Sequence, residues 1–290
     1  MAVIKWRNHH LEDIEIALLL KAMKDRYGYD FSNYAHASLK RRLKQLRDYF
    51  DVPHLSHLIP SLLYDEQVAQ VVINNISVPV SEFFRDPPVW RYLRDEILPR
   101  LNTFPRINIW QAGCGRGQET YTLLILLHEC GLLNKTRLVA TGINASAIDE
   151  ARAGRWSARE LDQWRTSYLA AGGQANFDDY FRHEGDELVI AEPLRQKVEF
   201  NQHNLVTDEV FMEAQFVVCR NVLIYFNDTL QERVLELFGR SLQRGGYLLL
   251  GSAESILRSS LADRTFQKIN TDLNVLRRTA EVCHVEGRHV

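Results

Sequence analysis

Residues 107–129, INIWQAGCGRGQETYTLLILLHE, decide the fold class, because an apolar run of strand length meets a glycine-rich turn and then a helical pattern. Gly113, Gly115 and Gly117 permit a tight turn and let a nucleotide-like ligand approach the backbone. A tight turn without a ligand gives the same spacing, so the pattern alone is weak evidence for a binding site. No Gly-Lys-Ser or Gly-Lys-Thr follows, which excludes a P-loop, and no acid ends the next apolar run, which disfavours an NAD site.

The same alternation of apolar runs and helical stretches continues towards the C-terminus. It predicts an α/β domain with a mostly parallel sheet, whose strands lie in RINIWQAG, TRLVATGI, KVEFNQHN, AQFVVCRNVLIYF and GGYLLLGS. The stretch from Trp156 to Gln196 breaks the alternation, and its YFRHEGDELVI part is typical of a hairpin. We therefore expect a small β-subdomain, approximately residues 157–196, inserted into a domain of residues 77–290.

Residues 1–76 show helical patterns without strands, which predicts a small α-helical bundle ahead of the α/β domain. Two apolar stripes are expected to face its core, and a third helix is expected through residues 55–77, with Pro60 near its start or at a kink. A Ser or Asn helix cap is expected within YGYDFSNYAHAS. The stripes consist of Leu11, Ile14, Leu18 and Met23, and of Leu39, Leu43, Leu46 and Phe50.

Composition excludes several classes of protein. The 290 residues carry a formal net charge of −2, which gives no electrostatic support for general nucleic-acid binding. Four cysteines without a C-x-x-C pair indicate neither a zinc ribbon nor a disulfide scaffold. No apolar segment has the length of a membrane span, and the start lacks the apolar core of a signal peptide, so we expect a cytoplasmic protein without membrane insertion.

Three further segments carry candidate residues. CRNVLIYF, residues 219–226, places Arg220 and Asn221 at the carboxyl edge of the sheet, as ligand-binding residues or as an end-of-strand cap. SEFFRDPPVW, residues 81–90, holds Arg85 between aromatic residues and prolines, directed towards a cleft or solvated in a linker. LKRRLKQLR, residues 39–47, is a basic helix, either a solvated face or a dock for an acidic helix, with calmodulin-like or membrane targets also suitable.

Motifs of covalent and metal-dependent hydrolysis do not occur. The ten histidines show no H-E-x-x-H spacing, and the sequence has no G-x-S-x-G elbow.

Taken in order, these segments resemble the CheR family, S-adenosylmethionine-dependent methyltransferases that esterify glutamate side chains of bacterial chemoreceptors. The resemblance runs from YGYDFSNYAHASLKRRL through SEFFRDP, IWQAGCGRGQETYT, ATGIN, FNQHNLV and CRNVLIYF to GGYLLLGSAESI. It implies an N-terminal helical domain, a Rossmann-like S-adenosylmethionine-dependent methyltransferase domain and an inserted small β-subdomain. It also implies S-adenosylmethionine as cofactor, S-adenosylhomocysteine as product, and no metal.

The resemblance also assigns site residues one by one. Arg85 and Tyr225 match the catalytic positions, Arg85 near the reacting carboxylate and Tyr225 near the methyl group. Methyl transfer from a sulfonium to an ionised carboxylate needs alignment rather than a strong base, which agrees with the missing catalytic histidine. The cofactor-binding positions implied are Ser81, Arg85, Gly113, Gly117, Glu119, Gly142, Asn204, Leu205, Asn221 and Val222.

Three departures from the family pattern concern the cofactor. Gln118 and Gly142 stand where acidic residues are usual, and Arg116 adds a positive charge. Losing a charged acceptor for the ribose costs about 1.5 to 3 kcal/mol, or about 10- to 150-fold in affinity. The leading hypothesis is an active protein-glutamate methyltransferase whose activity is reduced by Gly142 and Gln118. Its alternative is a CheR-like regulatory module without effective turnover that binds S-adenosylhomocysteine or an anionic nucleotide.

The expected partner is the glutamate-bearing methylation helices of a chemoreceptor-like protein. Opposite charge would steer these helices towards the basic helix. We expect the protein to act as a monomer. The basic residues assigned to this contact are Lys40, Arg41, Arg42, Lys44 and Arg47.

Overall fold

The computed structural model describes residues 11–254 and 265–279, which form two compact units. The first contains the described residues up to Val78 together with Ile224–Leu230, and the second contains the remainder. No helix in the described ranges is long and apolar enough to cross a membrane.

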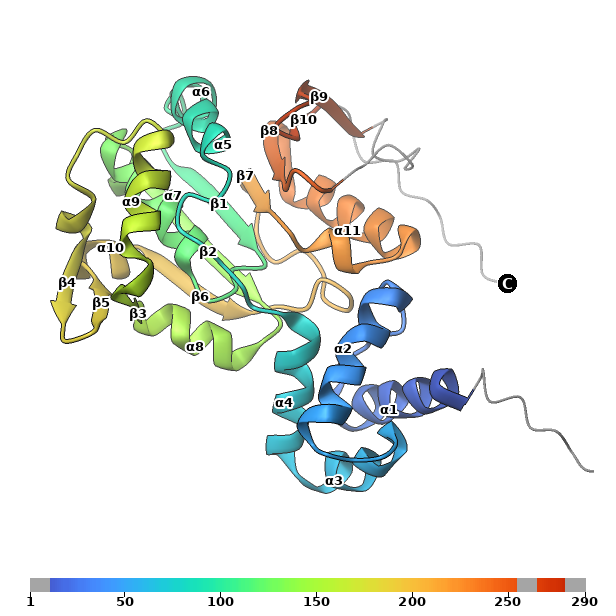
Figure 1. Ribbon diagram of the computed structural model, residues 1–290. Helices are drawn as coiled ribbons and strands as arrows, with labels where there is room; N and C mark the ends of the chain where they lie inside the picture. The colour runs from blue at the N-terminus through green and yellow to red at the C-terminus, as the bar shows by residue number, and fades with distance from the viewer. Residues whose placement is uncertain (1–10, 255–264, 280–290) are drawn as a thin grey trace, which may run out of the picture. The chain divides into compact units, whose positions relative to one another are not determined.

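The first unit is helical (Figure 1). Its core is formed by side chains with no exposed area, including Leu19, Met23, Leu43 and Leu62. The helix Glu66–Ser77 has an N-cap side chain, because the Asp65 carboxylate accepts a hydrogen bond from the Gln67 amide at 2.8 Å. The helices are α1 (Leu11–Tyr27), α2 (His36–Tyr49), α3 (Leu58–Tyr64) and α4 (Glu66–Ser77), with a 3-10 turn η2 (Leu55–His57) before α3.

Segment Ile224–Leu230 packs with this helical unit although it is distant in sequence. The Ala35 amide donates to the Tyr225 carbonyl at 2.7 Å, and the Asn227 amide donates to the Asn33 carbonyl at 2.9 Å. Tyr34 and Phe226 form an isolated antiparallel bridge, with ring centroids 5.1 Å apart. The motif CRNVLIYF is therefore divided, with its last three residues, 224–226, in the helical unit.

Three expectations for the helical unit are wrong in detail. In α1, Leu11, Ile14 and Leu18 are half exposed or more, because the apolar sequence covers more than one helix face and burial follows Ile16 and Leu19 instead. The expected third helix is two helices that separate at Asp65, although Pro60 does lie near the start of the first of them, in the first turn of α3. The N-cap residue of α2 is Ala35 instead of the expected Ser or Asn, and its side chain cannot accept a hydrogen bond from the first turn of the helix.

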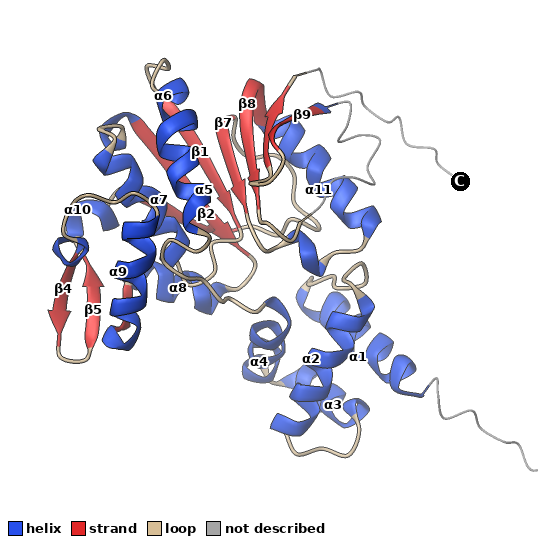
Figure 2. Ribbon diagram, turned by 45° about the horizontal axis from the view of Figure 1, so that its top comes forward, coloured by secondary structure: helices blue, strands red, loops and turns tan. Residues whose placement is uncertain are grey.

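The second unit is built on a seven-stranded sheet of order β6-β2-β1-β7-β8-β10-β9 (Figures 1 and 2). The strands from β6 to β8 in this order run parallel, and β10 and β9 are antiparallel. Strand β1 lies between β2 and β7, so the strand order reverses there, and open α/β sheets place ligands at such a point. The strands are β1 (Ile107–Ala112), β2 (Thr136–Gly142), β6 (Val198–Gln202), β7 (Ala214–Cys219), β8 (Leu242–Leu250), β9 (Phe266–Asn270) and β10 (Val275–Arg278).

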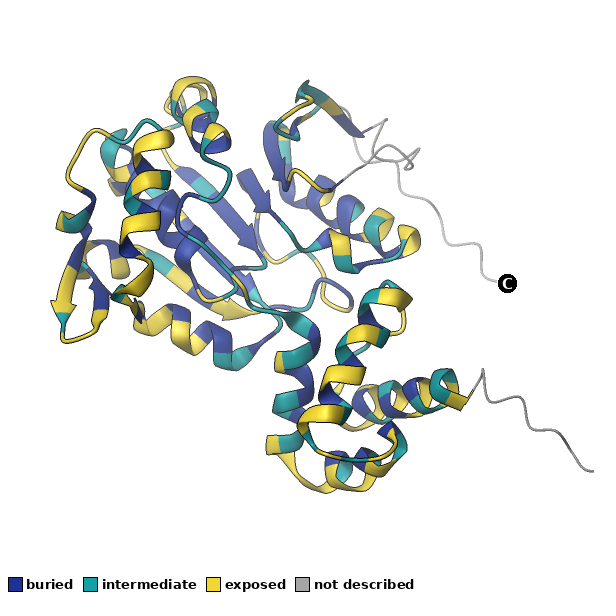
Figure 3. Ribbon diagram, in the orientation of Figure 1, coloured by how far each residue is buried: buried dark blue, intermediate teal, exposed yellow. Residues whose placement is uncertain are grey.

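Helix α7 is the centre of the core of this unit. All its residues from Gln118 to Leu127 are buried, as Figure 3 shows for the helix, and in the strand β1 before it all residues but Asn108 are buried. A helix that is apolar almost all round must be covered on every side. The helices of the unit are α5 (Pro87–Tyr92), α6 (Leu98–Leu101), α7 (Gln118–Glu129), α8 (Ala145–Ala153), α9 (Leu161–Ala170), α10 (Glu192–Arg195) and α11 (Asp228–Ser241).

The inserted β-subdomain is a three-stranded antiparallel sheet, β3 (Arg155–Ser157), β5 (Glu187–Ile190) and β4 (Phe181–Glu184). Its aromatic side chains surround Phe83, whose ring centroid lies 4.8 Å from that of Trp164 and 5.1 Å from that of Trp156. The segment before Arg85 is therefore fixed by the subdomain.

The predicted fold class is confirmed, including the helical bundle, the Rossmann-like sheet and the small β-subdomain. The predicted strands and the hairpin at 181–190 are present. Two features were not predicted from the sequence: the helical segment 87–101, where Pro87, Pro88 and Pro99 disguise the pattern, and the two short strands β10 and β9 at the end of the sheet.

Candidate functional site

The glycine turn after β1 is held against the end of β2. The amides of Gly113 and Cys114 both donate to the Thr141 carbonyl at 2.8 Å. Gly113 has φ +89°, and a Cβ there would lie 2.3 Å from Cγ2 of Val222. Gly117 has φ +91°, with a virtual Cβ 2.9 Å from that of Ala151. Both positions therefore require glycine, for conformation and for close packing.

Ser81 caps helix α7 from another part of the chain. Gly117, the cap position, has no side chain, and Ser81 Oγ accepts a hydrogen bond from the Glu119 amide at 3.0 Å. The neighbouring Gln118 side chain is buried, and its Oε1 has no hydrogen-bond partner in the described structure. A buried acceptor without a partner is costly in a folded protein, so Gln118 is well placed to bind a donor group of a ligand.

Arg220 forms the buried ionic centre of the second unit. Its side chain has no exposed area and lies 2.6 Å from carboxylate oxygens of both Asp86 and Glu119. Its guanidinium also lies over the Trp90 ring, 5.4 Å from the centroid. Two carboxylates and one guanidinium leave a net negative charge close to the glycine turn. Arg220 is thus an internal ion-pair partner rather than an end-of-strand cap.

Arg85 combines a fixed backbone with a free side chain. Its carbonyl accepts hydrogen bonds from Trp90 Nε1 at 2.8 Å and from Arg220 Nη1 at 3.4 Å. Phe84 and Asp86 on either side have left-handed backbones, φ +52° and +56°, which cost about 1 to 3 kcal/mol each and mark functional segments. The Arg85 guanidinium is half-buried and forms no ion pair or hydrogen bond with any described residue.

Glu254 holds the turn that carries Asn221 and Val222. Its Oε1 accepts from the amides of Val222 at 2.8 Å and Leu223 at 2.7 Å, and its Oε2 accepts from the Gly251 amide. Burial raises the pKa of Glu254, although the hydrogen bonds from these amides act in the opposite direction and lower it. Asn221 has φ +61°, so this turn is a strained one that Glu254 stabilises. Glu254 is not among the site residues predicted from the sequence, although it lies in the segment GSAESI that carries the family resemblance.

Replacing Glu254 by alanine is expected to lower the free energy of unfolding by about 2 to 4 kcal/mol, because three buried or partly buried amides lose their acceptor. Urea denaturation measures the change. Glu209→Ala is the matched control, since Glu209 forms an exposed pair with Arg240 at 2.9 Å and should cost less than about 1 kcal/mol. Equal losses in the two variants would show that Glu254 does not hold the turn.

Gly142, Asn204 and Leu205 lie at the ends of β2 and β6. Gly142 pairs with Gln202, and its φ lies outside the left-handed region. A Cβ there would meet Cys114 Sγ at 3.4 Å, an ordinary contact. Asn204 closes the next turn through its Oδ1, which accepts from the Val206 amide at 3.0 Å, and Leu205 is buried.

The structure therefore places Val222 against Gly113 at one point of the glycine turn, and Ser81 against Gly115 and the Glu119 amide at another. Gly142 lies beside the same turn at Cys114. Tyr225 belongs to the helical unit. The roles implied for these residues stay predictions.

The charges that suggested docking or altered specificity are largely paired within the chain. Arg116 Nε lies 3.0 Å from Glu150 Oε2. Lys40 binds Glu12 at 2.9 Å and Asp13 at 3.0 Å, Lys44 lies 3.4 Å from Glu12, and Arg47 binds Asp48 at 2.8 Å. Of the five basic residues assigned to the partner, only the exposed Arg41 has no ion pair or hydrogen bond among the described residues.

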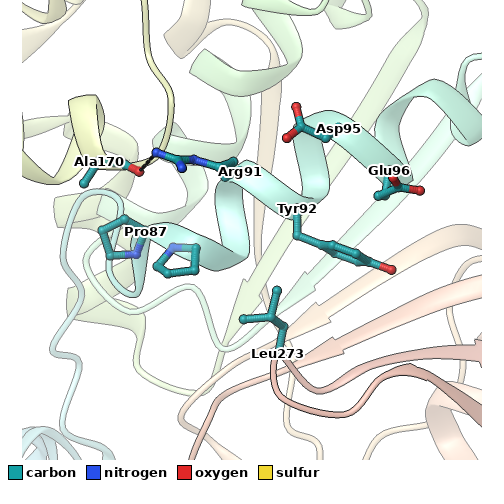
Figure 4. Close-up of a pocket in the computed structure, with 8 residues that line it drawn as sticks. Pro87, Arg91, Tyr92, Asp95, Glu96, Ala170 and Leu273 are labelled. Atoms are coloured by element: carbon teal, nitrogen blue, oxygen red, sulfur yellow. Dashed lines mark hydrogen bonds between the residues drawn. The ribbon is translucent and has the colours of Figure 1, made fainter.

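A hollow on another part of the second unit contains none of the predicted site residues (Figure 4). Arg91 on its wall already donates to the Ala170 carbonyl at 2.8 Å. Its apolar wall includes Pro87, Tyr92 and Leu273. Within residues 11–254 and 265–279 no group of three His, Cys, Asp or Glu side chains could hold a metal ion.

Comparisons with known proteins agree on one family. Residues 79–274 match the model of the CheR methyltransferase SAM binding domain, and residues 14–77 match that of the CheR methyltransferase all-alpha domain. The chain is 43% identical over 252 residues to "Putative methyltransferase Cher3" of Pseudomonas putida, covering 87% of this chain and 92% of that protein.

More distant relatives carry the same kind of name. A chemotaxis protein methyltransferase of Listeria innocua is 28% identical, with 82% of this chain and 88% of that protein covered. One of Vibrio parahaemolyticus is 29% identical, with 85% and 90% covered. The solved N-methyltransferase NodS of Bradyrhizobium japonicum with S-adenosyl-L-homocysteine aligns over 68% of this chain and 91% of its own, at 16% identity and a TM-score of 0.38, too weak a likeness to carry an argument.

Proposed function

This chain belongs to the CheR methyltransferase family, as the sequence predicted, and from that premise we propose that it transfers a methyl group from S-adenosylmethionine to glutamate side chains of a chemoreceptor-like signalling protein. The observation that carries the proposal is Arg85, whose half-buried guanidinium has a fixed backbone and no partner among the described residues. An arginine side chain without an internal partner can bind a planar carboxylate through two parallel hydrogen bonds.

The site residues fit S-adenosylmethionine. Gly113 and Gly117 hold the turn in a left-handed conformation against Val222 and Ala151, which fixes the backbone that a ligand would meet. The net negative charge of Asp86, Arg220 and Glu119 suits a cationic ligand, and Gln118 Oε1 is an available acceptor. When bound, S-adenosylmethionine supplies the electrophilic methyl group.

The chain's own residues have simple tasks in this reaction. A glutamate side chain is ionised at neutral pH, so no residue needs to remove a proton. Arg85 would hold the carboxylate in line, and Tyr225 would frame the reacting methyl group. Ser81, Asn221 and Val222 would position the cofactor, and Asn204 and Leu205 would flank its adenine.

Replacing Gly142 by aspartate is expected to tighten binding of S-adenosylmethionine about tenfold, because it adds a charged acceptor at the ribose position. The backbone permits this side chain, since φ is not left-handed and the nearest atom to a Cβ is 3.4 Å away. Calorimetry measures the affinity. Gly142→Ala adds the Cβ alone and should change it little. An aspartate variant no tighter than the alanine variant would show that other groups hold the ribose.

The proposal extends to the partner and the compartment. The exposed Arg41 on α2 can bind glutamates on a receptor helix. Lys40, Lys44 and Arg47 could bind them as well if they released Glu12 and Asp48, with which they now pair. Arg42 is discussed below. A protein that acts on the cytoplasmic methylation region of a receptor would itself be cytoplasmic, and one chain holds every residue assigned here, so a monomer suffices.

The experiment mixes the purified chain, tritiated-methyl S-adenosylmethionine and a cytoplasmic receptor fragment. We expect time-dependent label on the receptor fragment. Binding of S-adenosylhomocysteine without any transfer would contradict the proposal and favour the regulatory module. That alternative gains no support from the structure, since Arg116, which suggested an anionic ligand, already pairs with Glu150.

A further inference from the structure

Tyr225 is held by the helical unit rather than by the sheet. Its carbonyl accepts the Ala35 amide at 2.7 Å, just before the first turn of α2. The next residue, Phe226, packs against Tyr34. The backbone of Tyr225 is thereby joined to the start of α2, but these contacts leave its side chain free to rotate about χ1.

The side chain of Tyr225 is in contact with Arg42, from the second turn of α2. The Arg42 guanidinium lies over the ring, with Cζ 5.0 Å from the centroid. A second contact fixes the guanidinium itself, because Nη1 donates to the Asn75 carbonyl in the last turn of α4 at 3.2 Å. A planar guanidinium that is fixed by Asn75 restricts the ring that it covers.

Arg42 differs in environment from the other basic residues of its helix. It is half-buried, its Nε has no contact with solvent or with a hydrogen-bond partner, and burial lowers its pKa while Tyr225 raises it. Arg41, its neighbour in sequence, is exposed and has no ion pair or hydrogen bond with a described residue. Adjacent residues on one helix therefore face different surroundings.

We propose that Arg42 is a positioning residue that fixes the ring of Tyr225, instead of a receptor-docking residue as the sequence suggested. The inference rests on the proposed function only for what Tyr225 does in methyl transfer. The contact between Arg42 and Tyr225 stands independently of it. Helix α2 then has two separate roles. Arg41 can contact a partner, and Arg42 positions the side chain of Tyr225.

The kinetic test compares Arg42→Gln with Arg41→Gln, which removes one charge from the same helix. With a receptor fragment as substrate, Arg42→Gln should lower kcat about tenfold with little change in KM, because the ring is misplaced after binding. Arg41→Gln should instead raise KM for the receptor in a salt-dependent way and spare kcat. Arg42→Lys keeps the charge without the planar stack and should lower kcat to a lesser extent.

A second readout needs no methyl transfer. 3-Fluorotyrosine at position 225 gives a ¹⁹F resonance that should move or broaden in Arg42→Gln and stay unchanged in Arg41→Gln. An unchanged resonance in Arg42→Gln, or an Arg42→Gln variant that shifts only KM as Arg41→Gln does, would overturn the proposal. A wild-type chain that transfers no methyl group would contradict the proposed function, and the ¹⁹F comparison would still decide the role of Arg42.

Discussion

Replacing Arg85 by alanine is expected to lower kcat for methyl transfer about 100-fold, while the affinity for S-adenosylhomocysteine changes less than about tenfold. The reason is that the backbone and the side chain of Arg85 have different partners. Its carbonyl is used by Trp90 and Arg220 and remains in the variant, whereas its guanidinium, which has no partner among the described residues, is lost. A carboxylate that binds without this donor is no longer held in line.

Single-turnover labelling gives the rate and calorimetry gives the affinity for S-adenosylhomocysteine. Arg85→Lys serves as the graded control, because it keeps the charge but loses the two parallel donors, and its rate should fall between those of wild type and alanine. If Arg85→Ala raised only KM for the receptor and left kcat intact, Arg85 would bind the receptor without aligning the reacting carboxylate.

Replacing Arg220 by methionine is expected to lower the free energy of unfolding by about 3 to 5 kcal/mol, because Asp86 and Glu119 then keep charges without their common partner. Guanidinium chloride denaturation measures this loss. Arg137→Met is the matched control: Arg137 pairs with Glu199 at 2.8 Å on the surface and should contribute less than about 1 kcal/mol.

Removing the unpaired charge should restore part of the stability. Glu119→Gln in the Arg220→Met background is expected to recover a measurable fraction of the loss, because one buried carboxylate becomes neutral. A loss in Arg220→Met no larger than in Arg137→Met, or no recovery in the double variant, would mean that the ion pairs of Arg220 with Asp86 and Glu119 contribute little to folding.

Local patterns predicted those parts of the fold that depend on neighbours in sequence. Apolar runs bounded by turns located the parallel strands, and the spacing of Leu39, Leu43 and Leu46 located the buried face of α2. The face of α1 was wrong because LEDIEIALLLKAM is apolar on more than one side, and only packing decides which side is buried. Strand β10 and the edge strand β9 are short and carry charges, so they lack the alternation that identifies a half-buried strand.

In the candidate site, too, only features that depend on neighbours in sequence could be predicted. Gly113 and Gly117 could be selected because a glycine turn between strand and helix is a local signal. The partners of Arg220 could not, because Asp86 lies 134 residues away, and the same holds for the link between Glu254 and the turn at Val222. Arg42 was assigned to docking because a run of basic residues does not reveal which of them is covered by an aromatic ring.

The chemical nature of the transferred methyl group tests the central claim most directly. After reaction with tritiated-methyl S-adenosylmethionine, the labelled receptor fragment is treated with mild base and its peptides are analysed by mass spectrometry. We predict that base releases the label as methanol and that the modified residues are glutamates, because the product is a side-chain ester. Label that resists base, methylation on lysine, or no label from a chain that binds S-adenosylhomocysteine would contradict the assignment as a protein-glutamate methyltransferase.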